Sequence, residues 1–396
     1  MIWKNKGHEL DQKVADLLAQ NPQRKYYIFG AGLLGKELMP VLQAYGCLAA
    51  FIDNSIEKQR EGVGKIPVIS METYLNLKDG QIVIAASPQN TIVIREQLKS
   101  FSLKHERDFF LYDEFVNQIF PIISVYGFGK SYVSLVQITL TERCTLKCKK
   151  CAHGCFAVDN SRSEDMSLSQ AYKSADSFFA KVDFIKEFVL IGGEPFLYKD
   201  FAKVIEYIGE RYRGQIGIYA ITTNGTIVPE EDVLRACRKY GVLVRISNYI
   251  RQIPRLKSFI ERLIDTLEEN KVSFALGDEE SEWMDYGFEC VDHGTDEEYL
   301  IKVFDACRTP CREVRENRFY YCVMARSVSD NLKFYVGQKD YLDLDGLTGK
   351  EYKKELLEFT LGYSDKGYLD MCRHCNGAEA RNCPIPPAEQ AKRNDT

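Results

Sequence analysis

Cysteine spacing is the feature of this sequence that carries the most chemistry. The 396-residue chain contains 13 cysteines, and several fall in short-spaced groups, at positions 144, 148, 151 and 155, at 307 and 311, and at 372 and 375. No apolar stretch follows the lysines near Met1, so we expect no secretory signal. In such a chain this spacing favours metal binding over disulfides, and the reduced thiols that metal ligation needs indicate a cytoplasmic protein.

The first group contains a CxxxCxxC loop formed by Cys144, Cys148 and Cys151. Gaps of this length allow one loop to place three thiolates at three corners of an iron–sulfur cube, which leaves the fourth iron without a protein ligand. The alternative is a zinc knuckle, which needs a fourth ligand such as Cys155 or His153. We expect Cys155 to be a buried spare thiol, but the loop by itself leaves both sites open.

Polar or glycine-rich turns follow the next three expected strands. The turn residues are Gly192, Gly193 and Glu194 after the second strand, Thr223 and Asn224 after the third, and Ser247 and Asn248 after the fourth. Adjacent glycines let the backbone approach a ligand closely. With CxxxCxxC after strand one and Gly-Gly-Glu-Pro after strand two, the chain resembles the radical S-adenosylmethionine (SAM) superfamily.

That resemblance implies a 4Fe–4S cluster on Cys144, Cys148 and Cys151, whose open iron chelates the amino and carboxylate groups of SAM. It also implies that the turn residues line the SAM site, with Gly192, Gly193 and Glu194 near the amino group. Many relatives have an aromatic residue just before the third cysteine, where this chain has Lys150. Adenine must therefore stack elsewhere.

The distal cysteines indicate a second metal site. Its candidate ligands are Cys307, Cys311, Cys322, Cys372 and Cys375. The residues between Cys311 and Cys322 predict a hairpin that turns near Asn317, since asparagine tolerates the left-handed conformation. This part resembles the Twitch and SPASM extensions, which implies one auxiliary 4Fe–4S cluster. Five thiols compete for four positions, and a structural zinc on the same thiols is the alternative.

A glycine loop near the N-terminus has the form GxGxxG, with Gly30, Gly32 and Gly35, and Asp53 ends the next expected strand. After a strand and before a helix, this motif indicates a dinucleotide site, with the acid near a ribose hydroxyl. The region resembles the Rossmann-like modules of bacterial surface-sugar enzymes. That resemblance leaves three possibilities: NAD, a nucleotide sugar, or a structural role without ligand.

These motifs fall on three regions of an α/β chain. Residues 1–125 alternate strands and helices and predict a doubly wound Rossmann-like domain. Residues 121–130 show no amphipathic period and are expected to be a linker. Residues 132–290 predict a partial (β/α)6 radical SAM barrel with its chemistry at the carboxyl ends of the strands. Residues 291–396 are expected to form a small Twitch/SPASM-like extension that holds the auxiliary Fe–S cluster.

Within the barrel region the hydrophobic pattern gives individual elements. The expected strands are 133–140, 185–191, 216–222, 242–247 and 272–276, and the expected helices are about 168–181, 200–212, 230–240 and 254–270.

The composition of the chain argues against two classes of binding partner, nucleic acids and membranes. A net charge of -5 argues against nucleic-acid binding, and no apolar run reaches the ~18–20 residues that span a bilayer. These observations favour a small molecule or a peptide as the substrate. The resemblance of the N-terminal region to surface-sugar modules implies a sugar or nucleotide sugar of surface polysaccharide metabolism. The radical SAM resemblance implies that this substrate is oxidised or epimerised after hydrogen abstraction by a 5′-deoxyadenosyl radical. A one-electron donor such as flavodoxin or ferredoxin is the implied partner. Modification of a ribosomal peptide and a non-catalytic zinc scaffold remain alternatives, and no catalytic side chain is assigned.

Overall fold

The structure, a computed structural model, describes residues 9–288, 291–307, 309, 311–334, 337, 340–349, 351–362 and 367–391. It divides into two compact units. The N-terminal unit holds residues 9–134 and 182–186, and the C-terminal unit holds the described residues among 135–181 and 187–391. Among the described residues no helix is both long and apolar enough to cross a bilayer.

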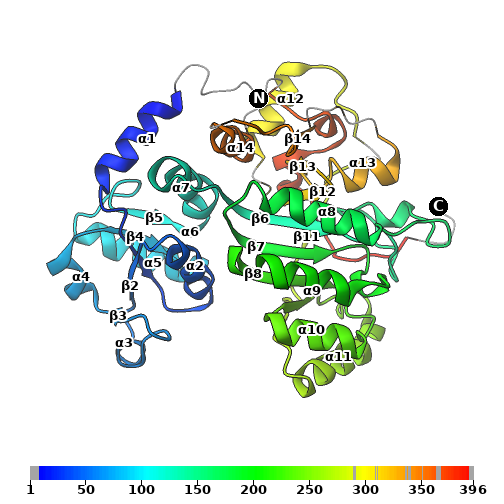
Figure 1. Ribbon diagram of the computed structural model, residues 1–396, viewed down its shortest axis with the longest axis horizontal. Coiled ribbons are helices and arrows are strands. Elements are labelled where there is room, and N and C mark those ends of the chain that lie inside the picture. The colour runs from blue at the N-terminus through cyan, green and yellow to red at the C-terminus, as the bar shows by residue number, and fades with distance from the viewer. Residues whose placement is uncertain are drawn as a thin grey trace. The chain divides into compact units, whose positions relative to one another are not determined.

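The N-terminal unit contains a five-stranded parallel sheet in the order β3-β2-β1-β4-β5 (Figure 1). Its strands are β1 (Tyr26–Phe29), β2 (Leu48–Ile52), β3 (Val68–Ile69), β4 (Gln81–Ile84) and β5 (Phe109–Leu111). Its main helices are α1 (Glu9–Gln20), α2 (Leu33–Ala44), α3 (Ile56–Glu61), α4 (Met71–Leu77), α5 (Pro88–Ser100), α6 (Tyr112–Glu114) and α7 (Phe120–Phe128), with a π-helical turn at Phe115–Ile119. β1 and β4 are buried along their whole length, as expected for central strands covered on both faces.

Residues 121–130 are not the linker that we predicted. Most of them belong to α7, which begins with buried residues and ends at Gly129 in the left-handed conformation, φ 65°. The segment lacks an amphipathic period because it is apolar on nearly every side, as a helix inside a core is. The sequence pattern was therefore a sign of burial and not of a connection.

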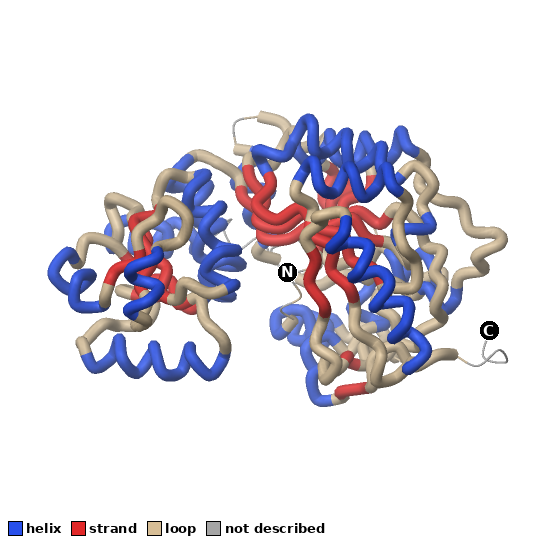
Figure 2. The backbone as a smooth tube through the Cα atoms, turned by 90° about the horizontal axis from the view of Figure 1, so that it is seen from below, coloured by secondary structure: helices blue, strands red, loops and turns tan. Residues whose placement is uncertain are grey.

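The C-terminal unit is built on an eight-stranded sheet in the order β10-β9-β8-β7-β6-β12-β13-β14. The first five strands in chain order are β6 (Tyr132–Thr139), β7 (Phe184–Ile191), β8 (Ile216–Thr223), β9 (Leu243–Ile246) and β10 (Phe274–Leu276). The helices between them are α8 (Leu168–Phe179), α9 (Phe201–Tyr212), α10 (Glu231–Tyr240) and α11 (Lys257–Glu269). Figure 2 shows a row of helices along one face of these strands. The predicted α/β class is confirmed.

The rest of this unit carries the distal cysteines. Its larger elements are α12 (Glu297–Ala306), β12 (Arg312–Arg315), β13 (Arg318–Tyr320), α13 (Ser327–Leu332), β14 (Tyr341–Asp343) and α14 (Tyr352–Thr360). Two short strands, β11 (Trp283–Met284) and β15 (Pro384–Ile385), pair antiparallel, and 3-10 turns cover Asp370–His374 and Gly377–Asn382. β12 pairs parallel with β6, so the extension continues the main sheet.

The hairpin predicted between Cys311 and Cys322 is present as β12 and β13, but its turn differs from the prediction. Glu316 has the left-handed conformation, φ 51°, and Asn317 does not. Asn317 instead donates its side-chain amide to Asp343 of the neighbouring strand at 2.7 Å. The asparagine therefore joins two strands of the sheet and is not the residue that permits the turn.

Candidate active site

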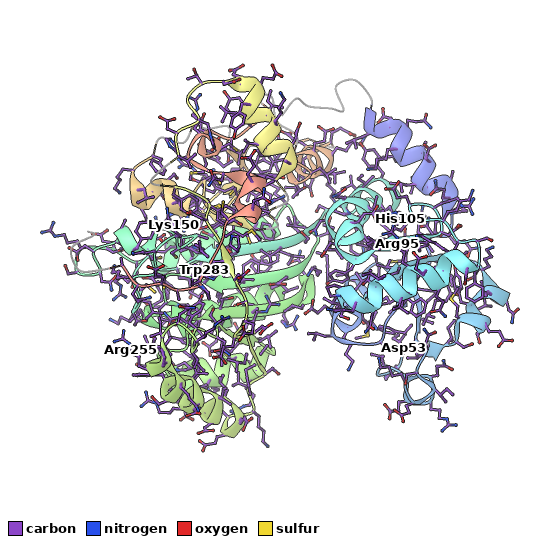
Figure 3. All side chains as sticks on the ribbon, turned by 180° about the vertical axis from the view of Figure 1, so that it is seen from behind. Asp53, Arg95, His105, Lys150, Arg255 and Trp283 are labelled. Atoms are coloured by element: carbon purple, nitrogen blue, oxygen red, sulfur yellow. The ribbon has the colours of Figure 1, made fainter. Side chains whose placement is uncertain are left out.

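One cavity of about 360 Å³ in the C-terminal unit gathers most of the residues selected from the sequence. Of the predicted residues, the lining includes Cys144, Cys148, Cys151, Gly192, Gly193, Thr223, Asn224 and Ser247. They come from the loop after β6 and from the carboxyl ends of β7, β8 and β9, because ends of adjacent strands meet at one edge of the sheet. Lys150 and Trp283, which Figure 3 labels on the same side of this unit, also line it.

The three thiols of the loop have different surroundings. Burial raises the pKa of Cys144 to about 11 and that of Cys148 to about 12. The pKa of Cys151 is lowered to about 7, chiefly because the Cys155 thiol donates a hydrogen bond to it, helped by backbone N–H groups. Cys155 is itself buried and is absent from the cavity lining. Ligands must be thiolates, so metal loading releases protons from Cys144 and Cys148.

Hydrogen-bond donors already face the sulfur atoms of the two high-pKa thiols. Asn224 Nδ2 and the Leu146 backbone N–H both lie 3.5 Å from Cys144 Sγ. Gln390 Nε2 lies 3.3 Å from Cys148 Sγ. Three thiols on one cavity wall, each with donors that stabilise a thiolate, fit the cluster that the CxxxCxxC spacing implies.

The paired glycines at the end of β7 allow close backbone contacts within the chain, independently of any ligand. A Cβ on Gly193 would overlap the backbone of Arg143, and one on Gly192 would lie 2.7 Å from the Thr141 carbonyl oxygen. The Gly193 N–H donates to that Thr141 oxygen at 2.8 Å. The close approach thus holds the start of the cysteine loop against β7, a role that the sequence reasoning did not anticipate.

Glu194 is completely buried and is absent from the cavity lining. Its carboxylate accepts hydrogen bonds from the Thr223 hydroxyl at 2.8 Å, the Asn224 N–H at 2.9 Å and the Phe196 N–H at 3.2 Å. Burial raises its pKa to about 7 in spite of these donors. The side chain therefore fixes the turn after β8, and through Asn224 it positions a donor to Cys144.

Asn248 is also outside the lining, and its side chain accepts from the Ile250 N–H at 3.3 Å. Several lining residues were missed from the sequence, namely Tyr249, Glu282, Trp283, Met284 and Tyr286. The Tyr249 and Trp283 rings meet edge to face, 5.7 Å between centroids. Tyr249 directly follows Ser247 and Asn248 at a strand end, which was a usable signal. Trp283 lies in β11, after β10, where no motif marks it.

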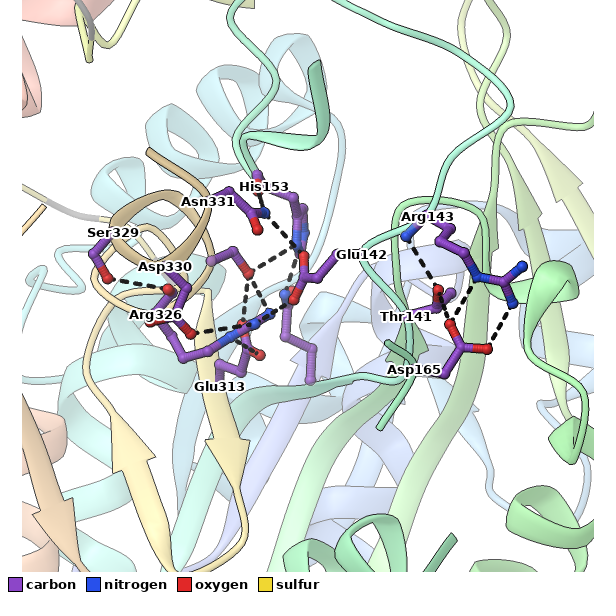
Figure 4. Close-up of polar contacts among 12 residues, drawn as sticks. Thr141, Glu142, Arg143, His153, Asp165, Glu313, Arg326, Ser329, Asp330 and Asn331 are labelled. Carbon is purple, nitrogen blue, oxygen red and sulfur yellow. Dashed lines mark hydrogen bonds and ion pairs between the residues drawn. The ribbon is translucent and has the colours of Figure 1, made fainter. Parts of the chain in front are cut away.

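A buried ion network joins the cysteine loop to the extension (Figure 4). Arg326, 1% exposed, pairs with Glu142 of the loop and, at 2.5 Å, with the fully buried Glu313 of β12. Asn331 donates both to Glu142, at 3.0 Å, and to the His153 carbonyl oxygen, at 2.7 Å. Removing one partner of a buried ion pair costs about 3–5 kcal/mol, because the remaining charge is left buried and unpaired.

A second cavity, of about 290 Å³, brings the distal cysteines together. All five of Cys307, Cys311, Cys322, Cys372 and Cys375 line it. Burial and the neighbouring Cys307 and Cys375 thiols raise the pKa of Cys322, and burial with Cys375 and Cys322 raises that of Cys372. Ala152, Met284 and Tyr286 line both cavities, so the two sites share a wall.

Cys311 has a distinct environment in this group. Burial raises its pKa, whereas Arg312 and a hydrogen bond from Thr309 lower it. Its carbonyl oxygen accepts from the Val323 N–H at 3.1 Å, next to Cys322. Among the described residues, no three His, Cys, Asp or Glu side chains are arranged around a point that could hold a single metal ion.

In the N-terminal unit the glycine loop and Asp53 lie together. The Asp53 carboxylate accepts from the Ala31 N–H at 2.9 Å, the Ser55 N–H at 3.0 Å and Lys58 Nζ at 2.9 Å. Although Asp53 is buried, these partners hold its pKa below the usual value. The acid thus ties its own strand end to the glycine loop.

The three glycines of this loop differ in the space that a side chain would have at each position. Gly30 has φ 115° and packs against Ala85, and a Cβ on Gly35 would overlap the Gly30 carbonyl oxygen. Gly32, at the start of α2, has open space where a Cβ would point. Two of the glycines are therefore needed by the fold, and the third faces a free volume.

A known protein family matches the part of the chain that supplies many of the residues lining the first cavity. Residues 138–253 match the sequence profile of the radical SAM superfamily. The match covers the CxxxCxxC loop and the GGEP turn and agrees with the superfamily that these motifs predicted for this part of the chain. No curated protein matches the chain.

Several solved structures resemble parts of the chain weakly. anSMEcpe with bound AdoMet is 22% identical over 36% of this chain and 42% of its own, with a TM-score of 0.30. SuiB of Streptococcus suis bound to S-adenosylmethionine is 15% identical over 48% and 45%, with a TM-score of 0.29. BtrN in complex with AdoMet and 2-DOIA is 15% identical over 65% and 97%, with a TM-score of 0.39. The chain spans less than half of the first two.

Proposed function

We propose that the chain is a radical SAM enzyme that abstracts hydrogen from a sugar or nucleotide sugar and thereby oxidises or epimerises it. The observation that carries the proposal is that Cys144, Cys148 and Cys151 share one cavity with the turns after β7, β8 and β9. When bound there, the cluster supplies the electron that cleaves SAM to a 5′-deoxyadenosyl radical.

The chain's own residues bind and orient the reactants. The backbone carbonyls at Gly192 and Gly193 accept from the SAM ammonium, and Ser247 contacts its ribose or carboxylate. Tyr249 and Trp283 provide aromatic rings against which adenine packs. They replace the aromatic residue that many relatives have at the position of Lys150. These rings also exclude water from a site in which a radical is formed.

The second cavity suits an auxiliary 4Fe–4S cluster held by four of the five cysteines that line it, Cys307, Cys311, Cys322, Cys372 and Cys375. Cys322 is close enough to Cys307 and Cys375 for electrostatic interaction, as are Cys372 to Cys375 and Cys311 to Cys307. Met284 and Tyr286 line both cavities, which supports a cluster in the second cavity that neighbours the proposed SAM site. An electron can therefore pass between substrate and cluster after hydrogen abstraction.

The N-terminal unit is proposed as a Rossmann-like domain for NAD or a nucleotide sugar. Its strand order and the open space at Gly32 favour a phosphate at the start of α2. This unit is the reason for proposing a sugar substrate. A one-electron donor of the flavodoxin or ferredoxin kind completes the reaction.

The test is anaerobic reconstitution with iron and sulfide, followed by SAM and a reductant. Wild-type protein should release 5′-deoxyadenosine, and the variant with Cys144, Cys148 and Cys151 all changed to Ala should not. Cys237→Ala, a buried thiol of α10, is the matched control and should remain active. Wild-type protein that takes up stoichiometric zinc and leaves SAM intact would contradict the proposal.

A further inference from the structure

A short distal segment, residues 388–391, runs antiparallel beside the cysteine loop through one isolated β-bridge. Cys148 and Gln390 form an antiparallel bridge. On either side of it the Lys149 N–H donates to the Glu389 carbonyl oxygen, and the Ala391 N–H donates to the Lys147 carbonyl oxygen, both at 2.7 Å. The backbone of the loop between the first and third cysteines is therefore held by a segment more than 200 positions away.

The Gln390 side chain adds contacts of its own. Its carbonyl oxygen accepts from the Lys147 N–H at 2.9 Å, and its amide nitrogen lies 2.7 Å from the Ala388 carbonyl oxygen and 3.3 Å from Cys148 Sγ. These partners fix the orientation of the amide, because the Lys147 N–H needs an acceptor and the Ala388 oxygen needs a donor. One N–H is thereby aimed at the sulfur of Cys148.

The same stretch of chain also shapes the opposite wall of the cavity. β15 pairs with β11, in register Trp283 with Ile385 and Met284 with Pro384. Both β11 residues line the cavity that contains Cys148. Residues 384–391 therefore contact two walls of one cavity, β11 and the cysteine loop. Within this segment the Gln390 side chain contacts Cys148, a candidate cluster ligand.

We propose that Gln390 is a positioning residue for the first cluster, whose amide N–H stabilises the Cys148 thiolate and raises the reduction potential of the cluster. This inference rests on the proposed function. Reduction adds negative charge to a cluster, and a donor to a ligand sulfur stabilises the reduced state more than the oxidised one. Removing the donor should therefore lower the potential.

The test is a redox titration of reconstituted protein, following the electron paramagnetic resonance signal that changes when SAM is added. Gln390→Met keeps the length of the side chain without a donor and should shift the reduction equilibrium about tenfold, which is 59 mV for one electron. Gln390→Glu puts a carboxylate beside the sulfur and should lower the potential further.

Glu389→Gln is the matched control, since the exposed Glu389 side chain pairs with Lys149 and does not reach the sulfur. Its potential should equal that of wild type. Loss of the SAM-sensitive cluster in Gln390→Met, with an unchanged circular dichroism spectrum, also supports the role. An unchanged potential and iron content in Gln390→Met, or an equal shift in Glu389→Gln, would overturn the inference. Wild-type protein without a SAM-sensitive signal would instead refute the proposed function.

Discussion

Glu194 shows at the scale of one residue how a buried acid can support a site without entering it. Its three donors lie on the turns after β7 and β8, and its pKa of about 7 results from burial. Since this pKa lies above that of an exposed glutamate, the folded protein binds the proton more tightly than the unfolded chain does. Stability from this group is complete below about pH 4.5 and is lost as the pH rises through 7.

Glu194→Gln should remove that pH dependence. The free energy of unfolding of wild type should fall by about 1–3 kcal/mol relative to the variant between pH 4.5 and pH 8, and change little above. Urea denaturation of both proteins at several pH values measures the difference. Parallel pH profiles would show that Glu194 ionises normally in the folded protein.

The fluorescence of Trp283 can be used to detect SAM binding in the first cavity. The sequence has only one other tryptophan, Trp3, so SAM binding should change a fluorescence signal that comes largely from the cavity wall. Trp283→Ala should weaken SAM binding about tenfold, because aromatic stacking on a base contributes about 1–3 kcal/mol. Trp283→Phe should largely retain the affinity, as measured by calorimetry. A fluorescence change that persists in Trp283→Phe and vanishes in Trp3→Phe would contradict this assignment.

At the scale of an element, the turn between β1 and α2 contains two kinds of glycine. Gly30 and Gly35 are required by close packing of the fold, whereas Gly32 borders open space. Gly32→Leu should leave thermal stability nearly unchanged, because its Cβ meets open space, but should abolish nucleotide binding by occupying the phosphate position. Gly35→Ala should instead destabilise the protein by about 1–3 kcal/mol through its clash with Gly30. Calorimetry with NAD and nucleotide sugars, together with thermal melts, distinguishes the two. Wild-type protein without heat of binding would leave the turn a purely structural role.

The elements that the sequence predicted well are those with a clean hydrophobic period. The expected helix at 168–181 is α8, and the expected strand at 216–222 is β8 extended by one residue. A period marks a half-buried surface, so it gave no information about α7, which is apolar nearly all round. The turn at Glu316 was missed because the sheet, through its contacts, imposes a conformation that this residue type rarely adopts.

For the whole molecule, the two groups of cysteines make a prediction about iron content. The triple Cys144, Cys148 and Cys151 variant should retain about four irons, and further replacement of Cys322 and Cys375 should remove them. Single replacement of Cys307 or Cys311 by Ala in the triple background identifies the spare thiol, because the four irons remain only when the replaced cysteine is not a ligand. Metal analysis of anaerobically reconstituted proteins measures each case. One zinc and no iron in the triple variant would make the distal site structural.

Contacts across the chain limited what could be predicted of the site. CxxxCxxC and the turn residues are local patterns, and the structure places eight of these predicted residues on one cavity. Trp283, Arg326 and Gln390 reach the site from far along the sequence, where no local pattern marks them. Glu194 and Asn248 have the expected positions at strand ends, yet both are used for hydrogen bonds within the chain.

The bridge between Gln390 and the cysteine loop has a consequence for the order in which the site is completed during synthesis of the chain. Gln390 lies 242 positions after Cys148. At about 5–20 residues per second, a ribosome needs roughly 12–50 s to synthesise that interval. During this time the nascent chain carries its three cysteines without the segment that bridges the loop. The first site therefore reaches the arrangement described here only after residue 390 has been synthesised.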